Sequence, residues 1–203
     1  MVQKVIGVTG TIGTGKSTVS RMLKSFGKKG VLVLDADKIA KKFLKKGSDS
    51  SKMLAQMFPD VVDKKGFIDS KKLADVVFES KSKLSMLNGL IHPFVIRSVK
   101  QKLEKLKEKF VVLDVPLLIE ADMLGIVDVL IIVNAEKTAV IKRSKFPKKE
   151  LEKRLSHQMS FEKKKEEAVK KLGKDKVFII NNSLDIRKTK DQLKSVWQKI
   201  SLK

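Results

Sequence analysis

The sequence contains no cysteine and only two histidines among its 203 residues. Disulfide bonds and cysteine-based zinc sites are therefore excluded, and a metal site built from several histidines cannot form. No apolar run approaches the roughly 20 residues that a membrane-spanning helix needs. The chain also enters its first apolar segment without the layout of a signal peptide. These absences lead us to expect a cytoplasmic protein with no membrane association.

Aromatic residues and arginines are scarce, although the chain is strongly basic. It carries 45 Lys and Arg against 23 Asp and Glu, a net charge of +22, which favours anionic partners such as nucleotides, phosphorylated metabolites or nucleic acid. There are no Tyr, one Trp and few Arg, so side chains suited to base stacking and bidentate phosphate contacts are rare. A solvated lysine-rich surface is therefore favoured over dedicated nucleic-acid binding, and we expect no specific nucleic-acid partner.

Residues 10–17 fit the pattern G-x-x-x-x-G-K-S/T at every fixed position. An apolar run at 5–8 predicts a buried strand before them, and apolar residues spaced as one helix face follow at 19, 22, 23 and 26. A phosphate-binding loop requires this order of strand, loop and helix, and both flanks disfavour the alternative of a plain glycine-rich turn. In such a loop the backbone N–H groups contact phosphate oxygens, Lys16 reaches the β- and γ-phosphates, and Ser17 can ligate Mg²⁺.

Segments typical of strands and helices alternate along the chain, which predicts an α/β fold with a mainly parallel sheet. Five apolar runs predict a five-stranded sheet flanked by helices, at 5–8, 31–34, 110–113, 127–133 and 177–180. Residues 38–108 instead carry amphipathic helical patterns, with a long helix expected to start at Pro93. Residues 136–176 are helical and highly charged. They fit a mobile basic lid, or equally a solvated pair of helices held by Glu–Lys pairs.

This pattern predicts three regions. The nucleotide-binding core comprises residues 1–37, 109–135 and 177–203, the helical insertion for the second substrate comprises 38–108, and the lid comprises 136–176. In a phosphate-loop protein such an insertion usually holds the acceptor.

Polar side chains follow several predicted strands, where open α/β sheets bind ligands. Asp35 can accept a proton from a hydroxyl nucleophile, whereas Asp37 can cap the next helix. Asp114 ends an apolar strand, a pattern that supports Mg²⁺ directly or through water. The pair Asn181-Asn182 follows the last strand, where a nucleotide base could lie. For His92, which precedes Pro93, the sequence alone favours a structural role.

Together these motifs resemble the dephospho-coenzyme A kinase family over nearly the whole chain. The resemblance rests on the phosphate loop and on Asp35-Ala36-Asp37, His92-Pro93, the segment 114–120, Arg154 with Gln158, and Asn181-Asn182. It implies ATP-dependent phosphorylation of the ribose 3′-hydroxyl of dephospho-coenzyme A, with ATP and dephospho-coenzyme A as small-molecule partners and Mg²⁺ as cofactor. We expect a P-loop kinase fold and a monomer.

The resemblance also implies roles for individual residues. Asp35 is implied as general base, Lys16 and Arg143 as catalytic cations, and His92 and Glu120 as acceptor contacts. The implied ATP contacts are Gly13, Thr14, Gly15, Lys16, Ser17, Thr18 and Asn181, with Mg²⁺ on Ser17 and on Asp114 through water.

The sequence departs from the family in the loop and in the lid. Thr11 stands where a second glycine is usual, and no second arginine follows Arg143, so that Lys145 would have to substitute. Two alternatives stay open. One is another small-molecule kinase, of the nucleoside or nucleoside-monophosphate type, and the other is a basic nucleic-acid binder that uses ATP only structurally.

Overall fold

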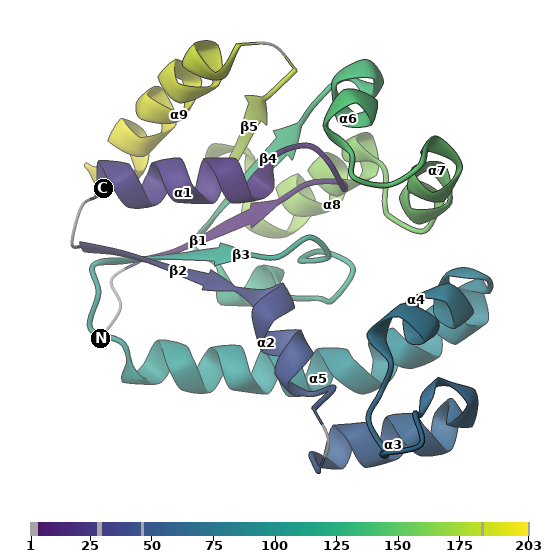
Figure 1. The fold of residues 1–203 in the computed structure, drawn as a ribbon. Coiled ribbons are helices and arrows are strands. Elements are labelled where there is room, and N and C mark those ends of the chain that lie inside the picture. Colours follow the sequence, from purple (N-terminus) through teal and green to yellow (C-terminus); the bar gives the residue numbers. More distant parts are fainter. Residues whose placement is uncertain (1–3, 28–29, 46, 184, 203) are drawn as a thin grey trace. The chain divides into compact units, whose positions relative to one another are not determined.

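The computed structural model describes residues 4–27, 30–45, 47–183 and 185–202 (Figure 1). A five-stranded sheet has the order β2-β3-β1-β4-β5, and every pair of neighbouring strands is parallel. The strands are β1 (Lys4–Thr9), β2 (Val31–Asp35), β3 (Phe110–Asp114), β4 (Val129–Asn134) and β5 (Val177–Asn181). The predicted parallel α/β sheet is thereby confirmed. Strand β4 begins two residues after the start of its predicted apolar run, because a 3₁₀ turn (Leu124–Ile126) and its C-cap residue Val127 come just before the strand.

The chain divides into two compact units. The first contains residues 1–35 and 103–203 and holds the whole sheet, and the second contains residues 36–102. The predicted boundaries of the acceptor insertion and of the lid are defined by function rather than by compactness, so they stay predictions. No helix in the described ranges is both long and apolar enough to cross a membrane.

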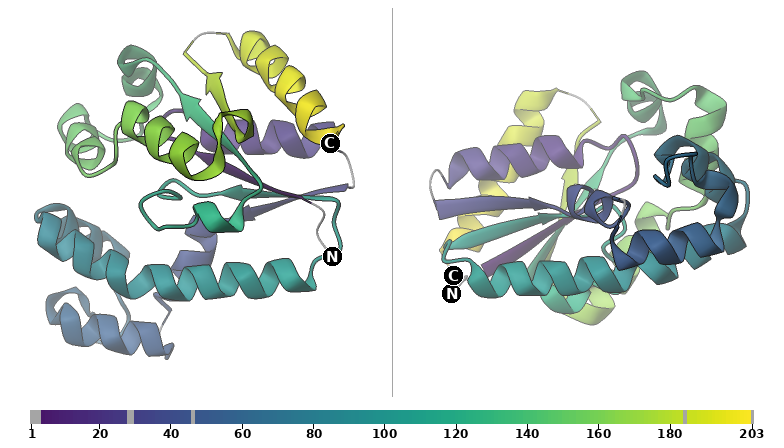
Figure 2. Two further views of the ribbon diagram at one scale, coloured as in Figure 1. Left: turned by 180° about the vertical axis from the view of Figure 1, so that it is seen from behind. Right: turned by 60° about the horizontal axis from the view of Figure 1, so that its bottom comes forward.

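Helices α1 (Lys16–Phe26) and α9 (Ile186–Ser201) cover one face of the sheet, as Figures 1 and 2 show. Val19 and Leu23 of α1 and Leu193 of α9 are buried in one cluster with the strand residues beneath them. Trp197 packs edge-on against Phe110, with ring centroids 4.8 Å apart. The apolar face predicted at residues 19, 22, 23 and 26 therefore packs into the core of this layer together with α9, because burial removes apolar area from water.

The other face of the sheet is covered by α8 (Phe161–Leu172), which lies across β4 and β5 (Figure 2). Ala168 of α8 is fully buried. Ahead of α8 come α6 (Lys137–Arg143) and α7 (Lys148–Ser156). A short 3₁₀ turn (Lys174–Lys176) links α8 to β5. Helix α8 thus belongs to the packed layers of the first unit.

The second unit is helical, as its amphipathic patterns predict. It contains α2 (Ala36–Lys42), α3 (Asp49–Met57), a 3₁₀ turn (Pro59–Val61), α4 (Ser70–Phe78) and α5, which is described from Lys81 to Lys105 and runs into the first unit. The expectation that Asp37 caps a helix is wrong. Helix α2 starts at Ala36, directly after β2, so Asp37 lies in its first turn, where a negative charge still favours the helix dipole.

The prediction of a helix start at Pro93 is also wrong, because α5 is continuous through it. Proline removes one backbone hydrogen bond, at a cost of about 3 kcal/mol in a helix interior. Ile91, Val95 and Val99 on both sides of it are buried. Each buried apolar side chain contributes about 1.5–3 kcal/mol, so the shared apolar face offsets the lost bond and holds the helix together. His92 consequently lies in the middle of a helix rather than at its start.

Candidate phosphate-transfer site

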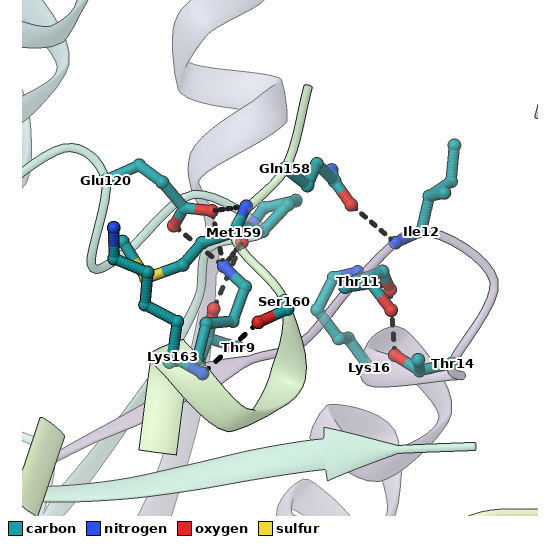
Figure 3. Close-up of polar contacts among 12 residues, drawn as sticks. Thr9, Thr11, Ile12, Thr14, Lys16, Glu120, Gln158, Met159, Ser160 and Lys163 are labelled. Carbon is teal, nitrogen blue, oxygen red and sulfur yellow. Dashed lines mark hydrogen bonds and ion pairs between the residues drawn. The ribbon is translucent and has the colours of Figure 1, made fainter. Parts of the chain in front are cut away.

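The phosphate loop joins β1 to α1 in the predicted context. Gly10, Gly13 and Gly15 all have positive φ (151°, 80° and 92°), which only glycine adopts without strain. The Thr11 carbonyl accepts hydrogen bonds from the Thr14 hydroxyl (2.8 Å) and from the Lys16 ammonium (3.0 Å), as Figure 3 shows. Helix α1 begins at Lys16 without a side-chain cap, so its first N–H groups and its dipole suit an anion.

The side chain of Asn182 supports this loop through a buried hydrogen bond. Its buried amide Nδ2 donates to the Thr14 carbonyl (2.8 Å), and its Oδ1 accepts from the Thr189 hydroxyl of α9 (2.9 Å). A β-carbon at Gly15 would collide with the same amide, so the close approach requires glycine there. The sequence analysis named the pair Asn181-Asn182 and selected Asn181 as the ATP contact; the exposed side chain of Asn181 accepts hydrogen bonds from the backbone and hydroxyl of Ser183.

Asp35 and Asp114 end adjacent strands and face each other in register. Asp114 is 7% exposed, and its Oδ2 accepts a hydrogen bond from the Ser20 hydroxyl (3.1 Å). Burial raises the pKa of the Asp114 carboxyl. The Ser20 hydrogen bond, the Lys16 ammonium and the Ser17 hydroxyl oppose that rise, while the negative charge of Asp35 adds to it. The structure thus brings Lys16, Ser17, Asp35 and Asp114 to one edge of the sheet.

Arg143 lies at the carboxyl end of α6, on the same unit as the loop. Its exposed guanidinium donates from Nη1 to the Asn182 carbonyl (2.5 Å). Asn182 therefore connects two predicted functional groups, since its side chain contacts the phosphate loop and its backbone contacts Arg143. Two sequence signals pointed to Asn182, namely its position beside Asn181 at the end of a strand and the place of this pair in the family resemblance.

Arg154, on α7, lies over the ring of Phe146 (4.2 Å to the centroid) and pairs with Glu150 (2.8 Å). Four residues later, Gln158 Oε1 accepts a hydrogen bond from the backbone N–H of Ile12 in the phosphate loop (2.9 Å). The segment between α7 and α8 therefore contacts the loop directly. The pair Arg154 and Gln158 was part of the sequence resemblance, but this contact could not be read from it.

Glu120 follows β3 and forms an ion pair with Lys164 of α8 (2.6 Å). The side chain of Lys164 is fully buried, and sequence reasoning missed it because it stands in a run of three lysines. His92 belongs to the second unit, where it is half-buried within α5. No cluster of three or more His, Asp or Glu that could hold a metal ion is present among the described residues.

Comparison with known proteins identifies the family. The family model for dephospho-CoA kinase matches residues 4–183. A dephospho-CoA kinase of Fusobacterium nucleatum is 40% identical over 183 residues, which cover 88% of this chain and 90% of that protein. A solved structure from Thermus thermophilus is 29% identical, with a TM-score of 0.76 and coverage of 98% of this chain and 99% of the other.

A solved dephospho-CoA kinase from Campylobacter jejuni is 25% identical, with a TM-score of 0.65, and the match covers 98% of this chain and 97% of that protein's chain. The similarity thus extends over both units of the chain. The chain belongs to the dephospho-CoA kinase family, and it is a transferase that uses ATP to phosphorylate dephospho-CoA in coenzyme A biosynthesis.

Proposed function

We propose that this chain transfers the γ-phosphoryl group of ATP to the ribose 3′-hydroxyl of dephospho-CoA through the residues at the edge of the sheet. The observation that carries the proposal is the meeting of the phosphate loop with two carboxylates, Asp35 and Asp114, which end adjacent strands. A phosphoryl-transfer site needs cations and N–H donors for the phosphates and a carboxylate for the attacking hydroxyl.

In this mechanism the N–H groups of residues 13–18 bind the ATP phosphates and Lys16 neutralises charge at the β- and γ-phosphates. Asp35 accepts the proton of the 3′-hydroxyl as its oxygen forms a bond to the γ-phosphorus. The bond between that phosphorus and the β–γ bridging oxygen breaks, and ADP leaves. Positioning and electrostatic stabilisation supply most of the rate, because the protein forms no covalent bond to the phosphoryl group.

The residues at this edge fit a magnesium ion. Asp114 is a buried carboxyl whose pKa is raised by burial and by Asp35, so a cation beside it would favour its ionised form. We assign the ion to the Ser17 hydroxyl and, through water, to Asp114. Mg²⁺ keeps several waters and takes few protein ligands beside nucleotide phosphates, so it requires no larger acidic cluster. When bound, it would neutralise charge on the β- and γ-phosphates.

The remaining roles are proposed from the family. Arg143 would stabilise charge on the transferring phosphoryl from the lid, residues 136–176, while Asn181 would lie beside the nucleotide base. His92 and Glu120 would contact the acceptor, with the helical region 38–108 as the coenzyme A domain. The carboxylate of Glu120 already pairs with Lys164, which leads to a different role argued in the next subsection.

The proposal is tested by measuring ADP release with Mg²⁺ and ATP in the presence of dephospho-CoA, adenosine, AMP or shikimate. We expect turnover with dephospho-CoA alone and a product identical to coenzyme A. Turnover with adenosine or AMP in its place would favour a nucleoside or nucleoside-monophosphate kinase. ATP binding without turnover of any acceptor would contradict the proposed reaction.

Two substitutions separate binding from chemistry. Lys16→Ala should abolish turnover and weaken ATP binding, because the loop loses its cation. Asp35→Asn should lower kcat by about 10²–10⁴-fold while ATP affinity changes little, since a general base contributes to the transition state. Asp175→Asn, an exposed carboxylate in a 3₁₀ turn, is the matched control. Unchanged turnover in Asp35→Asn would refute its assignment as base.

We also propose a cytoplasmic monomer without a nucleic-acid or membrane partner. The small-molecule substrates of the family require no such partner. Size-exclusion chromatography with light scattering checks the oligomeric state, and a salt titration with labelled RNA checks polyanion binding, which would weaken steeply with salt if lysines alone supplied it.

A further inference from the structure

Lys164 is a fully buried lysine outside the residues proposed to touch ATP. Its ammonium donates to both carboxylate oxygens of Glu120 (2.6 and 2.7 Å) and to the Pro116 carbonyl (3.3 Å). These acceptors match the three N–H donors of an ammonium group. Burial lowers the pKa of Lys164, and the charge of Glu120 opposes that shift. The pair is thus complete within the first unit, between α8 and the loop after β3.

Two short series of hydrogen bonds connect this pair to the phosphate loop. Glu120 Oε1 also accepts a hydrogen bond from the backbone N–H of Met159 (3.1 Å), and the next residue back, Gln158, accepts from the Ile12 N–H of the loop (2.9 Å). The Pro116 carbonyl also accepts from the hydroxyl of Thr9 (3.1 Å), at the end of β1 where the loop begins. Figure 3 shows Glu120, Met159 and Gln158 in this arrangement.

We propose that the Lys164–Glu120 ion pair is a positioning device that fixes the turn between α7 and α8 and so holds Gln158 against the phosphate loop. The inference rests on the proposed function, because it assigns the pair an effect on nucleotide binding by that loop. Lys164 and Glu120 act through Gln158 and do not contact the nucleotide. Glu120 is thereby a positioning residue for ATP, in place of the acceptor contact that the family suggests.

The energetics of buried ion pairs favour such a role over simple stabilisation. Removing two charges from water costs about as much as their attraction returns, and replacing a whole buried pair by uncharged residues is often neutral for stability. Because the Lys164 ammonium bonds to three defined acceptors, the ion pair holds the surrounding segments in a single geometry. Glu120 bonds to the backbone of the turn at Met159, so the geometry of the pair is passed on to the turn that carries Gln158.

The test uses the double variant Lys164→Met/Glu120→Gln, which removes both charges together and avoids leaving one buried charge without its partner. Thermal unfolding, the Kd for ADP, and KM for ATP and for dephospho-CoA are measured. We expect folding with Tm within a few degrees of wild type. The Kd for ADP and the KM for ATP should rise about 5- to 10-fold, the effect of one lost hydrogen bond to the loop, while KM for dephospho-CoA is unchanged.

Two further variants define the route. Gln158→Ala should raise the Kd for ADP by the same factor, and adding it to the double variant should raise it no further, because both act through the Gln158–Ile12 bond. Lys165→Met, at the exposed neighbouring lysine, is the matched control and should bind ADP as wild type does.

The outcomes distinguish this inference from the function on which it rests. Wild-type affinity for ADP in the folded double variant would refute the positioning role. A rise confined to KM for dephospho-CoA would also refute it and restore Glu120 as an acceptor contact. Additive effects of Gln158→Ala would refute the route through Gln158. If the wild-type protein itself failed to bind ADP, the proposed function would fall instead.

Discussion

Replacing Asn182 with alanine should loosen the phosphate loop and lower stability in separable amounts. The side chain makes two buried hydrogen bonds, to the Thr14 carbonyl (2.8 Å) and from the Thr189 hydroxyl (2.9 Å). Each contributes about 0.5–1.5 kcal/mol net, and the removed amide leaves a small void between the loop and α9. The Thr189 hydroxyl keeps a second acceptor, the Asp185 carbonyl at 3.4 Å, which reduces the loss on that side.

The expected total is about 2 kcal/mol, which for a chain of this size corresponds to a fall in Tm of about 4–8 °C. Affinity for ADP should fall about 5- to 10-fold, because the peptide between Thr14 and Gly15 loses the contact that fixes its orientation. Calorimetry with ADP and thermal unfolding of the same samples measure the two effects independently.

Thr189→Val is the matched comparison, since it removes only the bond from Thr189 to Asn182 in a side chain of the same shape. It should lower Tm yet change the Kd for ADP by less than about threefold, because the Thr14 contact is kept. Ser195→Ala, on the exposed face of α9, controls for the loss of a hydroxyl. Equal effects of Asn182→Ala and Thr189→Val on ADP binding, or none in either, would refute the reasoning.

Three further changes test other parts of the structure. Burial raises the folded-state pKa of Asp114, so stability falls as pH rises from the unfolded-state pKa of about 3.9 to the folded-state pKa, and this loss is absent at lower pH. Asp114→Asn should therefore raise Tm at pH 7 by about 2–4 °C, with the gain vanishing in acid, while turnover falls; a gain independent of pH would contradict this. Gly15→Ala should weaken ADP binding and destabilise the fold by about 1–2 kcal/mol or more, because φ is 92° and the Asn182 amide occupies the position of the added β-carbon. The control Gly125→Ala should change ADP binding little, since no atom lies within 4 Å of its added β-carbon. Pro93→Ala should stabilise the second unit by about 1–3 kcal/mol in urea unfolding by restoring a bond within α5, and a less stable variant would show that the proline is required for packing.

The sequence predicted the features that depend on local rules. Buried parallel strands appear as short apolar runs, and the phosphate loop has fixed glycines because its backbone needs positive φ at residues 10, 13 and 15. Since the carboxyl ends of parallel strands meet at one edge, the grouping of Asp35 and Asp114 with the loop was also predictable. The continuity of α5 was not, because local preference stops a helix at Pro93 whereas burial on both sides continues it.

The residues that support the site were hidden for a different reason. Lys164 stands between two other lysines, and composition cannot tell which of the three is buried, although its spacing of four from the buried Ala168 marks the inner face of α8. Asn182 bonds to Thr14 across 168 residues, and no periodicity connects the two.

By itself, then, the sequence determined the layers, the phosphate loop and the family, because each is encoded in short patterns of residues. Only the tertiary structure decided which asparagine holds the loop and which lysine pairs with Glu120. These choices depend on buried polar groups finding partners from distant segments, since an unpaired amide or ammonium in the interior costs too much free energy to persist.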